Sequence, residues 1–432
     1  MRLSGRLQAA IEVLEAILER HQPAATALAD WGRAHRIAGS GDRAAIGNLV
    51  YDALRRRASL AHAMGSDAPR SLALAALHVC WTMPAGAIEE LANGSRHAPQ
   101  ALSEAEKRGL AGHQDVAPPA HVAGDYPEWL SAAFERTFGA QAAQEGAALA
   151  RRAPVDMRAN TLKTTRDKLL EAMASDGATA TPLSPLGVRI KPPVGAGRSP
   201  NVEASNAHGR GWFEIQDEGS QIAALLGNAK PRCQVADICA GAGGKTLALA
   251  ASMENSGQIH AFDMDKHRLR PIFERLQRAG VRNAQVLEPG KLAHLNALAG
   301  RMDLVLADAP CTGSGVWRRR PDAKWRLKPA QLDQRLADQR SVLALGAPLV
   351  KPGGRLVYVT CSVLCEENTG QIDAFLVANP DFSVLPYADA WAANIGTPPP
   401  KSADGRTDTL LLTPARHGTD GFFVGILQRN AV

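Results

Sequence analysis

The chain has little cysteine, and its few cysteines do not form the patterns of a disulfide framework or a zinc site. Among 432 residues only six occur, at positions 80, 233, 239, 311, 361 and 365. So few cysteines argue against a fold that depends on a framework of disulfide bonds. No Cys-x-x-Cys pair is present, which argues against structural zinc. We therefore predict free thiols in a reducing compartment and no metal site.

Long apolar runs are also missing. No window approaches the roughly 20 apolar residues of a membrane span, and the N-terminal stretch lacks the apolar core of a secretory signal. These absences predict a cytoplasmic protein with no membrane partner. The 49 Lys and Arg residues exceed the 43 Asp and Glu residues, and the resulting net charge of +6 favours an acidic or polyanionic partner.

The length of 432 residues suggests two or three domains at about 150 residues each. Apolar residues at helical spacing predict an all-helical domain over residues 1–92. Prolines and an Asn-Gly pair predict a linker with one short helix over residues 93–127. Residues 128–210 predict a small basic α+β subdomain with a helix at 129–150, a strand at 155–162, a helix at 165–175 and a strand at 187–190.

Residues 211–432 alternate between apolar strands and helical patterns. Near-continuous apolar strands separated by helices predict an α/β fold with a doubly wound, mostly parallel sheet. The ligand of such a sheet sits beyond the carboxyl ends of its strands. The strands that we expect are Gln234–Cys239, Gln258–Asp263, Met302–Asp308, Arg355–Thr360 and Gly421–Leu427.

Two nucleotide-binding motifs are excluded by glycines that are absent from the loop Cys239–Thr246. A Walker A loop needs glycine at position 239, where the chain has Cys239, and a dinucleotide loop needs glycine at position 246, where it has Thr246. The loop fits adenosine with a small charged tail, as in S-adenosylmethionine. Asp263, at the end of the next expected strand, is placed to receive the hydroxyls of a ribose.

Two further cysteines, Cys311 and Cys361, each follow an expected strand. A thiolate that adds to C6 of a pyrimidine makes C5 electron-rich enough to accept a methyl group. A second group then helps to remove the C5 proton and to expel the thiolate. Asp308 is placed to stabilise charge near N3 of the ring. A zinc deaminase is excluded because Pro-Cys-x-x-Cys is absent, and the residues alone leave open which thiol attacks.

The motifs resemble those of the RsmB/NOP/SUN family of RNA cytosine-5 methyltransferases, and residues 1–92 resemble the NusB-type RNA-binding domain of its bacterial RsmB members. The resemblance extends over essentially the whole chain. It is carried by Arg158–Lys163, Phe213–Gln221, Cys239–Lys245, Asp308–Gly315, Arg320–Trp325, Tyr358–Ser362, Glu366–Asn368 and Asp420–Phe423.

This resemblance implies a Rossmann-like class I domain that uses S-adenosylmethionine. It implies that Cys361 is the nucleophile and that Cys311 assists product release. In related DNA enzymes the Pro-Cys cysteine attacks, so the swapped assignment stays an alternative. It also implies that Asp308 contacts the cytosine and that Lys245 faces the reacting base. The implied cofactor-binding residues are Cys239, Ala240, Gly241, Ala242, Gly243, Gly244, Lys245, Asp263 and Asp308.

The sequence departs from the family pattern at two places. The glycine loop has Gly241-Ala242 where the family has Ala-Pro, which predicts a looser cofactor loop. The family tends to have an aspartate after the third strand, and whether Glu288 replaces it stays open.

The partner that the resemblance implies is RNA, and no DNA partner is expected. Trp317–Lys328 holds six basic residues and two tryptophans, so it predicts a substrate channel that binds phosphate and stacks on bases. Arg55–Arg57 is a second candidate contact. By analogy the substrate is small-subunit ribosomal RNA. The alternatives are transfer RNA and, in a different class, a non-catalytic RNA-binding ribosome-assembly factor.

Overall fold

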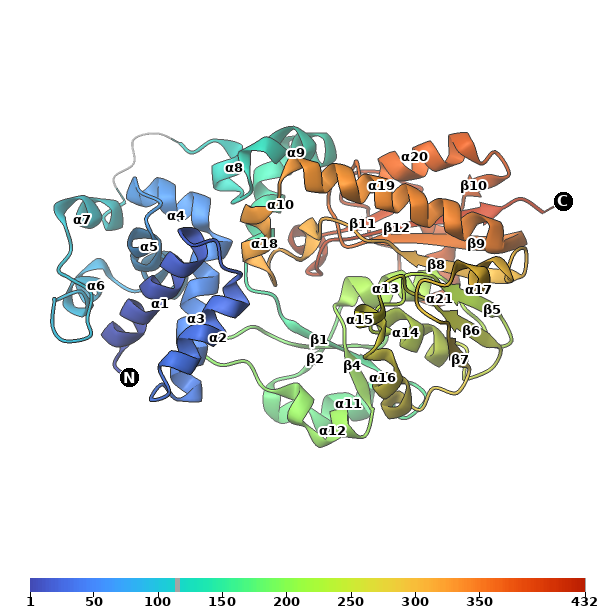
Figure 1. Ribbon diagram of the computed structural model, residues 1–432, viewed down its shortest axis with the longest axis horizontal. Helices are drawn as coiled ribbons and strands as arrows, with labels where there is room; N and C mark the ends of the chain where they lie inside the picture. The colour runs from blue at the N-terminus through green and yellow to red at the C-terminus, as the bar shows by residue number, and fades with distance from the viewer. Residues whose placement is uncertain (113–116, 432) are drawn as a thin grey trace. The chain divides into compact units, whose positions relative to one another are not determined.

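The computed structural model describes residues 1–112 and 117–431, and the chain divides into two compact units (Figure 1). The helical unit comprises Met1–Ala153, Pro192–Pro200 and Trp317–Arg326. The sheet unit comprises Pro154–Lys191, Asn201–Val316 and Leu327–Val432. The finer division into four parts stays a prediction.

Among the described residues, the secondary structure of the helical unit consists of helices. No helix among the described residues is long and apolar enough to cross a membrane. The helices are α1 (Leu3–Leu18), α2 (Ala24–Ala34), α3 (Ser40–Arg55), α4 (Arg57–Met64), α5 (Pro69–Trp81), α6 (Ala85–Leu91), α7 (Glu104–Leu110), α8 (Ala120–Ala123), η1 (Glu128–Leu130), α9 (Ser131–Phe138), η2 (Gly139–Gln141), α10 (Ala142–Leu149) and α18 (Pro321–Arg326).

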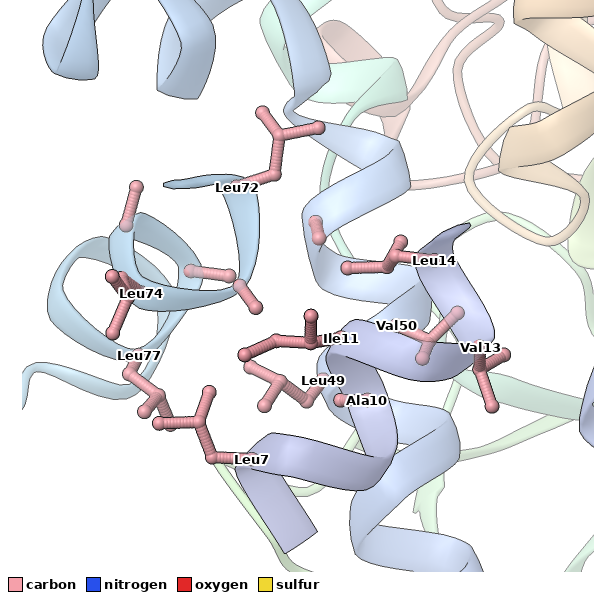
Figure 2. Close-up of a cluster of buried hydrophobic side chains, with 14 of the residues drawn as sticks. Leu7, Ala10, Ile11, Val13, Leu14, Leu49, Val50, Leu72, Leu74 and Leu77 are labelled. Atoms are coloured by element: carbon pink, nitrogen blue, oxygen red, sulfur yellow. The ribbon is translucent and has the colours of Figure 1, made fainter. Parts of the chain in front are cut away.

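The apolar stripes expected from helical spacing form the core of this unit. Side chains of α1, α3 and α5 point toward one another in Figure 2 and are buried. Burying them removes apolar surface from water, which is the main favourable contribution to folding. The residues labelled there are Leu7, Ala10, Ile11, Val13, Leu14, Leu49, Val50, Leu72, Leu74 and Leu77.

Two expectations for this region differ from the structure. The single helix expected over 129–150 is divided into α9 and α10, because Gly139 adopts a left-handed φ of 56° that an α-helix cannot continue through. The connection expected over 93–127 holds α7 and α8 rather than one short helix, and its residues 113–116 lie outside the described residues.

The sheet unit begins with a small antiparallel sheet in the strand order β2-β3-β1-β4. Met157, Val188 and Phe213 are fully buried in its core. Thr165 caps the helix α11 by accepting a hydrogen bond from the Lys168 N–H. The elements are β1 (Val155–Ala159), α11 (Arg166–Ala172), η3 (Ala174–Asp176), β2 (Thr179–Ala180), β3 (Gly187–Ile190), η4 (Val202–Ala204), α12 (Asn206–Gly209) and β4 (Phe213–Ile215).

The larger sheet has the strand order β10-β12-β9-β8-β5-β6-β7, and β11 pairs with β12. Its strands are β5 (Gln234–Asp237), β6 (Gln258–Ala261), β7 (Ala284–Val286), β8 (Met302–Asp308), β9 (Val350–Thr360), β10 (Phe382–Val384), β11 (Leu410–Leu412) and β12 (Phe422–Arg429). Its helices are α13 (Glu218–Leu226), α14 (Gly244–Ser252), α15 (Lys266–Leu269), α16 (Ile272–Ala279), α17 (Leu292–Asn296), η5 (Ser314–Val316), α19 (Pro329–Gly346), η6 (Ala347–Leu349), α20 (Thr369–Ala378), α21 (Tyr387–Asn394) and α22 (Pro414–His417).

Strands β5 to β9 pair in parallel, and β10, β11 and β12 are antiparallel. The predicted mostly parallel α/β sheet is thus confirmed, and the expected strand Met302–Asp308 has the bounds of β8. From β5 the chain runs outward to β6 and β7, then returns to place β8 on the other side of β5. This reversal between β5 and β8 is the switch point at which such sheets bind ligands.

Candidate active site

The candidate residues lie at the carboxyl ends of four parallel strands, at one edge of the sheet. The loop Cys239–Lys245 follows β5, Asp263 follows β6, Asp308 ends β8, and Cys361 follows β9. Because β5, β8 and β9 are neighbours and parallel, their carboxyl ends meet at the same edge. The residues predicted from separate motifs therefore gather at the switch point.

The thiols of Cys311 and Cys361 lie in contact, with their Sγ atoms 3.3 Å apart. Both cysteines are free, and the separation fits a thiol hydrogen bond rather than a covalent S–S bond of about 2.05 Å. The hydrogen bond with Cys361 and burial hold the pKa of Cys311 well above its ordinary value. Of the two thiols, Cys311 is therefore the one that holds its proton more tightly than an ordinary cysteine.

Lys245 and Asp308, two further candidate residues, form an ion pair. Lys245, in the first turn of α14, places Nζ 2.6 Å from Oδ2 of Asp308. The lysine side chain is 7% exposed, whereas that of Asp308 is 34% exposed. Lys245 also lies over the ring of Phe422, 5.3 Å from its centroid. The ammonium is thus held inside the site, and the carboxylate remains accessible from one side.

The glycine loop encloses a cavity of about 250 Å³, and the loop turns through two left-handed glycines. Gly241 has φ of 48° and Gly243 has φ of 85°. A Cβ at Gly243 would lie 2.5 Å from Cγ1 of Ile272, so the close packing of the loop on α16 also requires glycine there. The cavity is lined by Ile215, Gln216, Ser220, Asp237, Cys239, Ala240, Gly241, Ala242, Gly244, Lys245, Arg268, Arg275 and Asp308.

Asp237, Arg268 and Arg275 line this cavity but were not predicted from the motifs, and Asp237 is the acid among them. Its side chain is fully buried, and burial raises its pKa to about 7. Oδ2 accepts a hydrogen bond from Thr246 at 2.7 Å, the backbone of Cys239 also hydrogen-bonds to the carboxylate, and the residue lines the cavity. A buried carboxylate in the wall of a cavity can accept a hydrogen bond from a ligand that brings a donor. An acid inside the apolar strand β5 was the sequence signal for it.

Asp263 follows β6, as expected, and its carboxylate contacts the glycine loop. It is 4% exposed and does not line the cavity. Its Oδ2 accepts the Gly241 N–H and its Oδ1 accepts the Asp265 N–H, each at 2.9 Å. The carboxylate therefore holds the glycine turn, and its contact with a ribose stays a prediction. Glu288 also lies outside the lining of the cavity, and it forms a 2.6 Å ion pair with Lys291.

The basic segment Trp317–Lys328 does not present its tryptophans as free stacking surfaces, so this part of the expectation is wrong. Trp317 is 1% exposed, and its ring stacks on that of Phe134 with the ring centroids 6.1 Å apart. Trp325 donates its Nε1–H to the Leu54 carbonyl at 2.6 Å, and Lys324 donates to the Arg55 carbonyl at 2.8 Å. Burying the Trp317 ring is favourable, while Trp325 is half-buried, and composition alone could not reveal either position.

The second expected RNA contact, Arg55–Arg57, is also mostly engaged within the protein. Arg55 is largely buried, forms an ion pair with Asp52 at 2.9 Å and donates to the Arg318 carbonyl at 2.7 Å. Arg320, by contrast, is exposed. Phosphate contacts by this part of the chain can therefore come only from its outward-facing basic side chains.

Two sequence models of protein families match the chain. One is described as 16S rRNA methyltransferase RsmB/F and matches residues 224–428. The other is described as an RsmF/B-like ferredoxin-like domain and matches residues 126–196. Together they cover parts of both units.

Curated relatives and solved structures agree with these matches. The ribosomal RNA small subunit methyltransferase B of Sodalis glossinidius is 34% identical over 72% of this chain and 68% of its own length. A probable enzyme of the same name from Synechocystis is 33% identical over 70% of this chain and 67% of its own length. A methyltransferase homologue from Pyrococcus horikoshii is 28% identical with a TM-score of 0.59, over 72% of this chain and 97% of that chain. The protein PH0851 shares the fold with a TM-score of 0.73 at 24% identity, over 99% of both chains.

Proposed function

Because the chain belongs to the RsmB/F methyltransferase family, we propose that it methylates C5 of a cytidine in RNA with S-adenosylmethionine as the methyl donor. The RNA that we propose is small-subunit ribosomal RNA, which is the substrate in the names of its relatives. The observation that carries the proposal is the contact between the thiols of Cys311 and Cys361 beside the Lys245–Asp308 ion pair.

Cys361 is the nucleophile in this proposal. The two thiols are in hydrogen-bond contact, and Cys311 is the one whose pKa is raised, so we assign it the role of the proton-bearing partner. Addition of the Cys361 thiolate to C6 forms one C–S bond and moves an electron pair onto the ring, which makes C5 nucleophilic. The raised pKa of Cys311 supports this order of roles, because a thiol that keeps its proton cannot attack first.

Cys311 acts in the second half of the reaction. Once Cys361 is bonded to C6, it no longer raises the pKa of Cys311 through their hydrogen bond and its charge. Cys311 can then pass its own proton to water, and the resulting thiolate can take the proton from C5. The electron pair of the C5–H bond re-forms the ring double bond and expels the Cys361 thiolate.

Asp308 and Lys245 stabilise the ring during addition. Asp308 ends β8, three residues before Cys311, and is partly exposed, as a group that contacts a base must be. Lys245 holds its carboxylate at 2.6 Å. The Lys245 ammonium beside this carboxylate is the positive group that offsets the negative charge accumulating on the ring, and such stabilisation is strongest in a site that excludes water.

The cofactor-binding residues that we propose are those of the glycine loop, Cys239–Lys245, together with Asp237. When bound, S-adenosylmethionine supplies the methyl group. The buried Asp237 carboxylate in the cavity wall and the loop that turns at Gly241 and Gly243 fit a ligand with a charged amino-acid tail. Asp263 would hold the loop in place by accepting the hydrogen bond from the Gly241 N–H.

The decisive experiment is incubation of the protein with labelled S-adenosylmethionine and three substrates: small-subunit ribosomal RNA, small ribosomal subunits and transfer RNA. We expect labelled 5-methylcytosine in the ribosomal samples after digestion and base analysis. Label in transfer RNA alone would correct the substrate but keep the chemistry. If no sample yields 5-methylcytosine, the protein is not this enzyme.

A further inference from the structure

A buried carboxylate, that of Glu367, joins the two loops that carry the thiols. Glu367 follows β9 and is 0% exposed. Its Oε1 accepts hydrogen bonds from the Thr312 N–H at 2.8 Å and from Gln339 Nε2 at 2.9 Å. Its Oε2 accepts from Thr312 Oγ1 at 2.6 Å and from Ser362 Oγ. One side chain thus holds the residue after Cys311 and the residue after Cys361.

The same network holds the other side of Cys311. Gln339 Nε2, which binds Glu367, also donates to the Pro310 carbonyl at 3.0 Å. Pro310 and Thr312 are the two neighbours of Cys311, so both flanks of this cysteine depend on one hydrogen-bonded cluster. The Cys311 loop lies beyond the end of β8 and turns at Gly313 with φ of 71°, so no strand pairing fixes it.

Cys361 depends less on Glu367. It directly follows Thr360, the last residue of β9, which pairs with Phe423 of β12. Its carbonyl also accepts a hydrogen bond from the Gly315 N–H at 2.9 Å. Loss of Glu367 should therefore release the Cys311 loop while the backbone of Cys361 stays in place.

We propose that Glu367 is a positioning residue that keeps the Cys311 thiol in contact with Cys361, and that this contact determines how fast the methylated product is released. The inference rests on the proposed function. Glu367 does not touch the thiols in the structure; it acts through Thr312, Ser362 and Gln339. Its negative charge also contributes to the raised pKa of Cys311, which agrees with a thiol that keeps its proton until the second half of the reaction.

The test uses Glu367→Gln, which preserves size but replaces one acceptor oxygen by an NH2 group that cannot accept. In the wild type, the two oxygens of Glu367 together accept hydrogen bonds from four donors. With only one acceptor oxygen left, the hydrogen bonds to Thr312 should weaken. We expect turnover to fall at least tenfold, the KM for S-adenosylmethionine to stay within twofold, and a covalent protein–RNA adduct to exceed that of the wild type on a denaturing gel. A purely structural defect would lower turnover and adduct together.

Two further variants keep the test decisive. Thr312→Val removes one bond to Glu367 at constant size, so it should show the same adduct accumulation to a smaller degree even if Glu367→Gln does not fold in a thermal melt. Asp373→Asn removes an exposed carboxylate on α20 and should behave as the wild type.

Wild-type turnover in both Glu367→Gln and Thr312→Val would overturn the inference. So would a loss of turnover without an adduct above the wild-type level, because Glu367 would then act before or during attack. Failure of the wild type to form 5-methylcytosine is a different result, since it removes the proposed function itself.

Discussion

At the scale of single residues, the roles of the two cysteines can be separated by their adducts. Cys311→Ala leaves the proposed nucleophile but removes the group that takes the C5 proton, so the Cys361–C6 bond should persist. Cys361→Ala removes the nucleophile, so neither product nor adduct should form. We expect Cys311→Ala to give a protein–RNA band on a denaturing gel with turnover reduced at least 100-fold, and Cys361→Ala to give none.

Cys233→Ala is the matched control, because this cysteine lies before β5 and away from the site. It should retain turnover and show no persistent adduct. An adduct with Cys361→Ala in place of Cys311→Ala would reverse the two roles, and that outcome corresponds to the order of attack in the related DNA enzymes.

The sequence predicts the candidate residues that the structure brings together, but not the residues that hold them. Cys311, Cys361, Asp308 and Lys245 stand out because each ends or follows an expected strand or opens a helix. Parallel strands then bring them to one edge of the sheet. Glu367 acts through hydrogen bonds to residues 55 and 28 positions away, Thr312 and Gln339, and no local pattern encodes such long-range partners.

At the scale of elements, the turn before α14 should tolerate no side chain at Gly243. Alanine there must adopt φ of 85°, and its Cβ would meet Ile272 at 2.5 Å. The left-handed backbone costs about 1–2 kcal/mol, and the overlap adds to it. We expect Gly243→Ala to lower the melting temperature and to weaken S-adenosylmethionine binding at least tenfold in calorimetry.

Gly300→Ala supplies the control for backbone strain alone. Gly300 has φ of 66°, but a Cβ there would meet nothing within 4 Å. It should cost about 1–2 kcal/mol of stability and leave the cofactor affinity unchanged. Equal affinities for both variants and the wild type would show that the glycine loop does not form the cofactor site.

The segment Trp317–Arg326 should matter for stability through its tryptophan and for RNA through its exposed arginines. Trp317→Ala removes a buried ring that stacks on Phe134, which typically costs about 3–5 kcal/mol. Arg320→Ala should leave the melting temperature unchanged, weaken RNA binding and reduce its dependence on salt. Unchanged stability in Trp317→Ala, measured by denaturant unfolding, would contradict the buried position.

This segment is also where the sequence was most misleading. Six basic residues with two tryptophans are typical of a nucleic-acid surface, which predicts outward-facing tryptophans. The partners that these rings contact instead, Phe134 and the Leu54 carbonyl, lie more than 180 residues upstream. Periodicity finds elements such as β8, whose seven residues were predicted without error, but it does not find which distant element covers a loop.

At the scale of the whole molecule, buried Lys324 should give the helical unit a distinct pH dependence. Burial lowers its pKa to about 7, from an ordinary value of 10.5. Between these values the unfolded chain binds a proton that the folded chain has lost, so the free energy of unfolding rises with pH. Below pH 7 the lysine is charged in both states and the contribution stays constant.

The comparison of wild type with Lys324→Met isolates this effect. As pH rises from about 7 to 10, the stability of the wild type relative to the variant should increase, by at most about 1.4 kcal/mol per pH unit. Denaturant unfolding at pH 6, 8 and 9.5 measures it, and Lys328→Met controls for loss of an exposed ammonium. A stability difference that does not change with pH would contradict the buried, easily deprotonated lysine.

The helical unit is made of three pieces of chain, and this limits how the gene can be divided. A shortened chain that ends at Ala153 would omit Trp317–Arg326 and so leave the Phe134 ring and the Leu54 and Arg55 carbonyls without their partners. Removing residues 1–153 would likewise expose Trp317 in the remaining protein. Neither half can be exchanged between relatives by a single crossover, so the two units must be inherited, and engineered, together.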